Sequence, residues 1–99
     1  MAIEVRLSRT AQREYDDATA WYDSGQPGLG ARFVTAVERV LADIGDQPDR
    51  HPVAEDDVRE AAVPTPWPYT VYYRPRPDHV LVISVFHQSR DPRVWQARV

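Results

Sequence analysis

Apolar residues in the first half of the chain recur at two spacings, one typical of a strand and the other of helices. Residues 2–7 alternate between apolar and polar side chains, which predicts a half-buried strand. Ser8 is a good helix N-cap, and apolar side chains three or four positions apart predict a helix from there to about Ser24. The same spacing predicts a second helix over residues 29–44, ended by Gly45. Because the connector is short, we expect the two helices to pack as an antiparallel pair.

The second half of the chain has the pattern of strands. Residues 47–57 are polar and contain two prolines, so we predict a surface loop there. Three prolines within residues 64–68 interrupt strand pairing, because proline has no backbone N–H to donate. Strands are therefore predicted on either side of that interruption and after a proline-containing turn, over residues 58–63, 69–74 and 79–87. The last of these is the richest in Val and Ile, so we expect it to be central.

This central strand has apolar side chains on both faces. Strict alternation places one set on one face, Leu81, Ile83 and Val85, and another set on the opposite face, Val80, Val82 and Phe86. Two helices can cover only one face of a four-stranded sheet. The other face should then be covered by a partner protein, by Trp95 and the C-terminal tail, or by a second copy of the chain.

Composition limits the class of protein. The chain has 99 residues, 42% of them hydrophobic, which suits one domain spanning residues 1–99. It has no cysteine, which excludes disulfides and thiolate metal sites, and no apolar run approaches the roughly 20 residues of a membrane span. The first ten residues carry charges where a signal peptide would be apolar, so we expect a soluble, cytoplasmic protein that does not bind membranes.

Charge is unevenly distributed along the chain. All twelve basic residues are arginine, which excludes lysine-based catalysis and suits bidentate binding of phosphates or carboxylates. Residues 71–99 hold five Arg and two Asp, whereas residues 1–70 hold seven Arg and thirteen acidic residues. The C-terminal third is thus the basic part of a chain with net charge −3. The acidic residues of the first helix, Glu14, Asp16 and Asp17, are predicted to lie on its solvent-exposed face.

One segment, residues 87–98, gathers a histidine, three arginines and a tryptophan directly after the central strand. A histidine could transfer a proton while arginines stabilise a phosphate, and the candidate catalytic residues are His87, Arg59, Arg74 and Arg90. Trp95 could stack on a base. The alternative is structural: His87 caps the strand, Arg90 pairs with Asp91 or a helix carboxylate, and Trp95 covers the sheet edge. The three histidines lack ligand-pair spacing, so we expect no metal and no cofactor.

The order of motifs along nearly the whole chain resembles the RelE/ParE toxin superfamily. The matching residues are, in chain order, Trp21, Tyr22, Gly28, Leu29, Gly30, Arg32, Phe33, Pro48, Pro52, Arg59, Pro68, Tyr69, Val71, Tyr73, His87, Arg90, Pro92 and Trp95. The resemblance agrees with the pattern analysis and implies an α+β fold of order β-α-α-β-β-β. In such a fold a helical hairpin packs on one face of a small, mainly antiparallel sheet.

The resemblance implies a toxin of a bacterial type II toxin-antitoxin system, of the plasmid stabilisation kind, that inhibits growth. It also implies a cognate antitoxin whose C-terminal segment wraps the helix pair and sheet in a hetero-oligomer. ParE-like members poison DNA gyrase, whereas RelE-like members cut messenger RNA on the ribosome with lysines, arginines and a terminal aromatic residue or histidine. This chain has no lysine, and Gln88 stands nearest the position of a catalytic arginine.

We therefore expect a ParE-like toxin that binds a target such as gyrase, with a ribosome-dependent endoribonuclease or an inactive antitoxin-binding relative as alternatives. The residues predicted to bind the target or RNA are Arg76, Arg93 and Trp95. The residues predicted to bind the antitoxin lie on the face expected to be uncovered, and are Val80, Val82 and Phe86. The antitoxin segment should be acidic, with interleaved apolar residues that are buried against that face.

Overall fold

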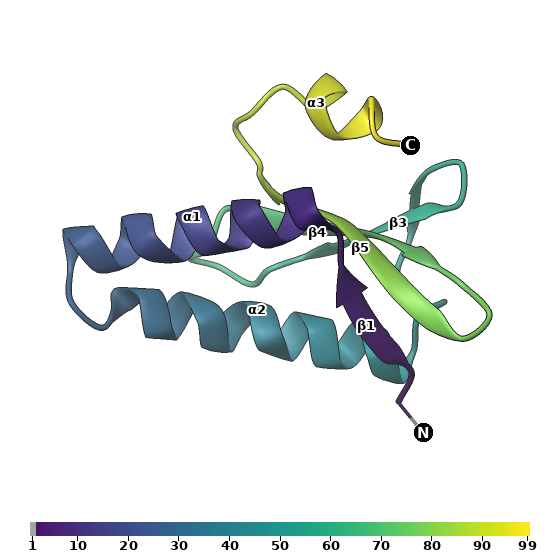
Figure 1. Cartoon of the computed structure of the whole chain (residues 1–99), viewed down its shortest axis with the longest axis horizontal. Coiled ribbons are helices and arrows are strands. Elements are labelled where there is room, and N and C mark those ends of the chain that lie inside the picture. Colours follow the sequence, from purple (N-terminus) through teal and green to yellow (C-terminus); the bar gives the residue numbers. More distant parts are fainter. Residues whose placement is uncertain (1) are drawn as a thin grey trace.

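A helical hairpin lies on one face of a five-stranded sheet, and a short C-terminal helix lies near the opposite face (Figure 1). The computed structural model describes residues 2–99. Its elements are β1 (Glu4–Leu7), α1 (Arg9–Gly25), α2 (Leu29–Asp46), β2 (Val53–Glu55), β3 (Val58–Ala62), β4 (Tyr69–Pro75), β5 (His79–His87) and α3 (Arg93–Gln96). The predicted α+β class and the hairpin are confirmed. No helix within these described residues is long and apolar enough to cross a membrane.

The helical hairpin begins and turns at residues suited to those positions. The hydroxyl of Ser8 accepts a hydrogen bond from the amide of Ala11 at 3.1 Å and so caps α1 as predicted. At the turn, Gly28 has φ +89°, a left-handed conformation that favours glycine. A Cβ on Gly30 would lie 2.8 Å from the carbonyl oxygen of Thr19, so glycine here lets α2 approach α1 closely. Both predicted helices are confirmed to within two residues at their ends.

The sheet has the strand order β1-β5-β4-β3-β2, which confirms β5 as a central strand. β1 is parallel to β5, and the other neighbouring pairs are antiparallel. The prediction of an uninterrupted loop over residues 47–57 is wrong, because β2 pairs with β3 through a tight turn in which Asp56 has φ 50°. A strand of three residues is too short for alternation to distinguish it from a loop.

The predicted faces of β5 are also wrong in part, because the strand contains a bulge. Tyr72 opposes Ser84 and Tyr73 opposes Val82, so β5 has one more residue than β4 at this point. Beyond the bulge, each side chain of β5 points to the face opposite to the one that strict alternation predicts. The side chains that pack under the helices are Val80, Val82 and Val85, and those on the opposite face are Leu81, Ile83 and Phe86.

The predicted antitoxin-binding residues are consequently not a surface of the free chain. Val80 and Val82 are fully buried beneath the helical hairpin, and Phe86 is buried on the other face. Trp95 of α3 packs against Phe86, together with Val58 and Ile83. Of the three ways to cover the second face, the structure therefore shows the C-terminal tail folding back over it.

Candidate functional site

The C-terminal segment is held to the rest of the molecule by one carboxylate of α1. The side chain of Glu14 is only 12% exposed and accepts hydrogen bonds from Ser84 Oγ at 2.9 Å and from the amide of Val85 at 3.2 Å. Arg98 reaches both carboxylate oxygens, at 3.1 and 3.2 Å, and Arg90 reaches one at 3.2 Å. We call Glu14, Ser84, Arg90 and Arg98 the Glu14 cluster. It joins α1, β5 and the tail.

Glu14 was predicted to lie on the solvent-exposed face of the helix, and this prediction is wrong. Glu14 lies three residues after Ala11 and four before Ala18, both of which are buried, so it shares their helix face. That spacing was the signal that could have identified it. Its partners come from positions 70 to 84 residues further along the chain, which no local pattern reveals.

Trp95 is the apolar anchor of the same segment. Its ring is 3% exposed and stacks on Tyr72 with ring centroids 3.9 Å apart and planes 16° apart. Its indole Nε1 is buried and has no hydrogen-bond partner among the described residues. A tryptophan buried in this way cannot stack on a base at the surface of the free chain. Trp95 is therefore structural, but the prediction that it covers the sheet edge is wrong, because its ring packs on the face of β3, β4 and β5.

The four predicted catalytic residues do not meet in one site. His87 opposes Tyr69 at one end of β4, whereas Arg59 opposes Tyr73, four residues or about 13 Å along the strand. Arg74 is one residue further still. Of the arginines, only Arg90 lies near His87, whose carbonyl accepts a hydrogen bond from the Arg90 amide at 3.1 Å.

Each of these arginines has a structural partner. Arg59 donates to the carbonyl of His51 at 2.6 Å and to that of Asp49 at 3.1 Å, so it holds the loop that follows α2. Arg74, on β4, donates to Asp57, which lies in the β2–β3 turn, at 2.9 Å. Arg90 lies over the ring of Phe86, 5.0 Å from its centroid, and pairs with the helix carboxylate Glu14, which confirms that structural alternative.

His87 lacks the partner that a general base usually has. Its Nδ1 accepts a hydrogen bond from the amide of Ser89 at 3.1 Å, so the neutral ring carries its proton on Nε2. Its ring also packs edge-on against Tyr69, with centroids 5.0 Å apart. Among residues 2–99 no carboxylate is hydrogen-bonded to this ring, and no three His, Asp or Glu side chains are grouped to hold a metal ion.

The two remaining arginines of the predicted binding set lie at the surface in different places. Arg76 donates to Asp57 at 3.3 Å, so this carboxylate is shared between Arg76 and Arg74. Arg93 is 85% exposed and is hydrogen-bonded to Asp91 at 2.7 Å, and this guanidinium lowers the pKa of the Asp91 carboxyl. Together with Trp95 they do not form one continuous surface of exposed groups.

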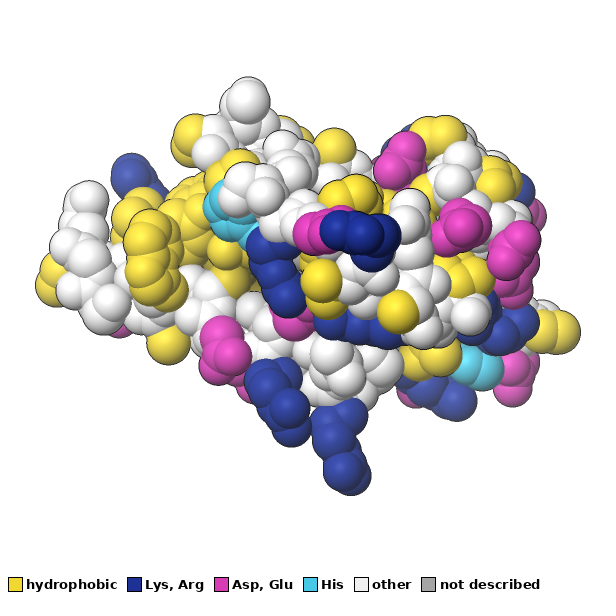
Figure 2. All heavy atoms as spheres, turned by 90° about the horizontal axis from the view of Figure 1, so that it is seen from above, with side chains coloured by type: hydrophobic (Ala, Val, Ile, Leu, Met, Phe, Trp, Pro, Cys, Tyr) yellow, Lys and Arg dark blue, Asp and Glu magenta, His cyan; other side chains and the backbone are white. Residues whose placement is uncertain are grey.

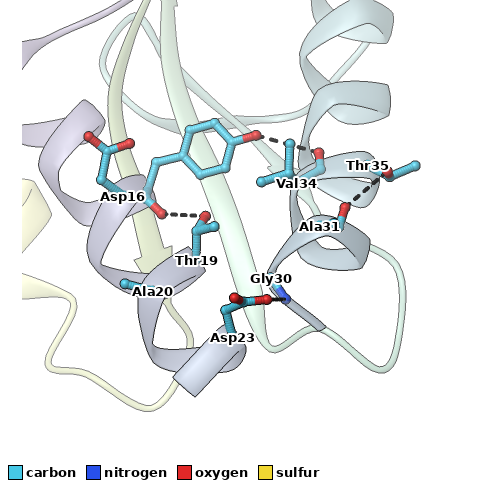
Figure 3. A pocket seen from close by; sticks show the side chains of 9 residues that line it. Asp16, Thr19, Ala20, Asp23, Gly30, Ala31, Val34 and Thr35 are labelled. Atoms are coloured by element: carbon cyan, nitrogen blue, oxygen red, sulfur yellow. Dashed lines mark hydrogen bonds between the residues drawn. The ribbon is translucent and has the colours of Figure 1, made fainter. Parts of the chain in front are cut away.

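One open surface of the molecule lies on the hairpin. A groove of about 900 Å³ runs between α1 and α2, where Asp23 points across to the amide of Gly30 (Figure 3). Seen from above, hydrophobic side chains gather toward the end where the two helices join, and charged side chains gather around the tail (Figure 2). At that hydrophobic end, Trp21 is 70% exposed.

Comparison with known proteins identifies relatives of the whole fold. The family model described as "ParE toxin of type II toxin-antitoxin system, parDE" matches residues 5–92. A search of curated proteins finds no match. A solved chain of the chromosomal ParDE toxin-antitoxin system from P. aeruginosa superposes with a TM-score of 0.74 at 13% identity, over 87% of this chain and 96% of that one. A chain of the RelBE2 toxin-antitoxin complex from Mycobacterium tuberculosis superposes with a TM-score of 0.63 at 22% identity, over 88% of this chain and 99% of that one.

Proposed function

Because the chain belongs to the family of ParE toxins of type II toxin-antitoxin systems, we propose that it inhibits growth by binding a target such as DNA gyrase. In this proposal the chain breaks no bond in its target. A cognate antitoxin neutralises it by forming a hetero-oligomer. Chains with the same fold come from the ParDE toxin-antitoxin system and from the RelBE2 toxin-antitoxin complex.

The observation that carries the proposal is that the arginines a ribonuclease would need are already bound to other groups of the chain. Arg59, Arg74 and Arg90 each hold a structural partner, and the first two lie more than ten ångströms along the sheet from His87, by a spacing of about 3.3 Å per residue. A phosphate in a transition state needs donors that converge on it from within hydrogen-bond distance. A binding surface has no such requirement.

The test is primer extension on messenger RNA in a cell-free translation reaction, with and without purified ribosomes. We expect the wild-type chain to leave the message intact in both reactions, while inhibiting growth when it is induced in its host. Ribosome-dependent cuts that vanish in the His87→Gln variant would overturn the proposal and establish the ribonuclease. A folded chain that neither cuts RNA nor slows growth would establish an inactive relative.

A further inference from the structure

A hollow of about 490 Å³ lies between α2 and residues 62–67, and His51 is part of its lining. We call this space the His51 pocket. On α2 it is lined by Ala36, Arg39 and Asp43, which are three and four residues apart and so share one face of the helix. Its remaining lining residues are Val40, Ala62, Pro64, Thr65 and Trp67. The volume falls in the range of about 300–1,000 Å³ that is typical of sites for small molecules.

Three interactions fix the position of His51. Its ring Nε2 lies 3.1 Å from Oδ2 of Asp43, and because a carboxylate only accepts hydrogen bonds, Nε2 carries the proton. The His51 carbonyl accepts a hydrogen bond from Arg59 at 2.6 Å, and the ring packs edge-on against Tyr73 with centroids 6.1 Å apart. The other ring nitrogen, Nδ1, is not buried and has no hydrogen-bond partner among residues 2–99. His51 therefore has the carboxylate partner that His87 lacks, and one nitrogen remains available to a ligand.

Positive charge exceeds negative charge at the His51 pocket. Asp43 has the one carboxylate of the lining, and it already binds Arg50 and His51; Arg50 lowers its pKa. Within residues 2–99, the arginines whose guanidinium group has no hydrogen bond or ion pair are Arg9, Arg13, Arg32 and Arg39. These free guanidinium groups all lie on α1 and α2, and of the four only Arg39 lines the pocket. An anion could therefore bind Arg39 without breaking an ion pair of the fold.

Trp67 gives the pocket a flat apolar wall. Its ring makes edge contacts with Tyr22 and Phe33, whose centroids are 5.0 and 5.4 Å away, so its position is fixed by the core. The side chain is half-buried, and it lines the pocket together with Arg39. An indole ring binds other flat rings through dispersion and stacking. The pocket thus combines an aromatic surface with an unpaired guanidinium group, which together suit a flat ring linked to an anion.

We propose that the His51 pocket binds a small phosphate monoester that carries a flat ring, as a mononucleotide does, a function separate from the target and antitoxin binding proposed above. The guanidinium of Arg39 donates two hydrogen bonds to the phosphate, and the ring of the ligand packs against Trp67. His51, when protonated, donates a third hydrogen bond from Nδ1, because Asp43 holds the other nitrogen. A monoester fits better than a nucleic-acid backbone, since the net charge of −3 on the chain disfavours a long polyanion.

Isothermal titration calorimetry of the full chain with adenosine 5′-monophosphate tests the proposal, and adenosine and inorganic phosphate probe the two halves of the ligand. Arg39→Gln removes the free guanidinium and breaks no ion pair of the fold. Arg9→Gln is the matched control, because it makes the same change at an unpaired arginine that does not line the pocket. Trp67→Leu removes the aromatic wall. Circular dichroism and thermal unfolding establish that each variant is folded.

We expect Arg39→Gln to bind the nucleotide about tenfold or more weakly, and Arg9→Gln to stay within about twofold of wild type. Trp67→Leu should weaken binding of the nucleotide and leave binding of inorganic phosphate unchanged. A wild-type chain that binds no nucleotide at millimolar concentration, or equal loss in the two arginine variants, would overturn the proposal and leave the proposed function intact. Adenosine that binds as tightly as the nucleotide would refute the role of the phosphate. A short 5′-phosphorylated oligonucleotide that binds more tightly than the mononucleotide would assign the pocket to nucleic acid instead.

Discussion

Replacing Glu14 with Gln should release the tail and lower the stability of the whole domain. The substitution keeps the shape of the side chain and removes its charge, so the new amide N–H groups face the donors of Arg90 and Arg98. A hydrogen bond to a charged group contributes about 1.5–3 kcal/mol, and the two arginines together would give more. Since the Arg90 side chain is 47% exposed, we discount its share and expect a loss of about 2 kcal/mol in the free energy of unfolding.

Urea and thermal unfolding monitored by circular dichroism measure this loss. A decrease of 2 kcal/mol corresponds to a fall in Tm of about 8–16 °C for a domain of this size. The matched control is Asp17→Asn, an exposed acidic residue of the same helix, which should change the free energy of unfolding by less than about 0.5 kcal/mol. In the variant Glu14→Gln/Arg98→Gln the two losses should not add, because each substitution removes the same ion pair. A Glu14→Gln variant as stable as the Asp17→Asn control would refute the role we assign to this carboxylate.

Three further predictions follow from packing and burial. Gly30→Ala should destabilise the chain by about 1–3 kcal/mol, because the new Cβ would lie 2.8 Å from the backbone of α1. Gly25→Ala is the control and should not destabilise the chain, because its Cβ would meet nothing within 4 Å. Equal effects of the two substitutions in urea unfolding would contradict this prediction. Burial raises the pKa of Tyr73 to about 12, so its contribution to stability is complete below its unfolded value near 10 and is lost as pH rises through 12. Tyr73→Phe, which also loses the 2.6 Å hydrogen bond to the Pro48 carbonyl, should lower stability at neutral pH. It should also remove one of the late tyrosine ionisation steps seen by ultraviolet titration, and an unchanged titration would be the contrary result. Trp95→Ala should cost about 3 kcal/mol and expose the second sheet face, so that the variant binds a hydrophobic dye that the wild-type chain does not bind.

The helices and the order of strands could be predicted because their patterns repeat. α1 and α2 carry their apolar stripes through 17 and 18 residues, and local residues such as Ser8 mark where they begin. β5 is long and rich in Val and Ile, which are typical of a central strand. These signals need no knowledge of distant parts of the chain.

What could not be predicted depends on single residues or on long-range contacts. One extra residue in β5 exchanged the two faces beyond it, so the grouping of Val85 and Phe86 was wrong although the strand itself was right. The pairing of Arg74 with Asp57 and of Arg98 with Glu14 is set by the fold and not by sequence spacing. A count of charges along the sequence therefore placed the free arginines in the tail, whereas in the fold they are on the helices.

The central claim is that the chain acts by binding a target rather than by cleaving one, and a gyrase supercoiling assay with purified components tests it most directly. We expect the chain to inhibit supercoiling in proportion to its concentration, His87→Gln to inhibit equally well, and added antitoxin to restore the reaction. Gyrase that supercoils normally in the presence of a chain that cuts ribosome-bound messenger RNA would contradict it.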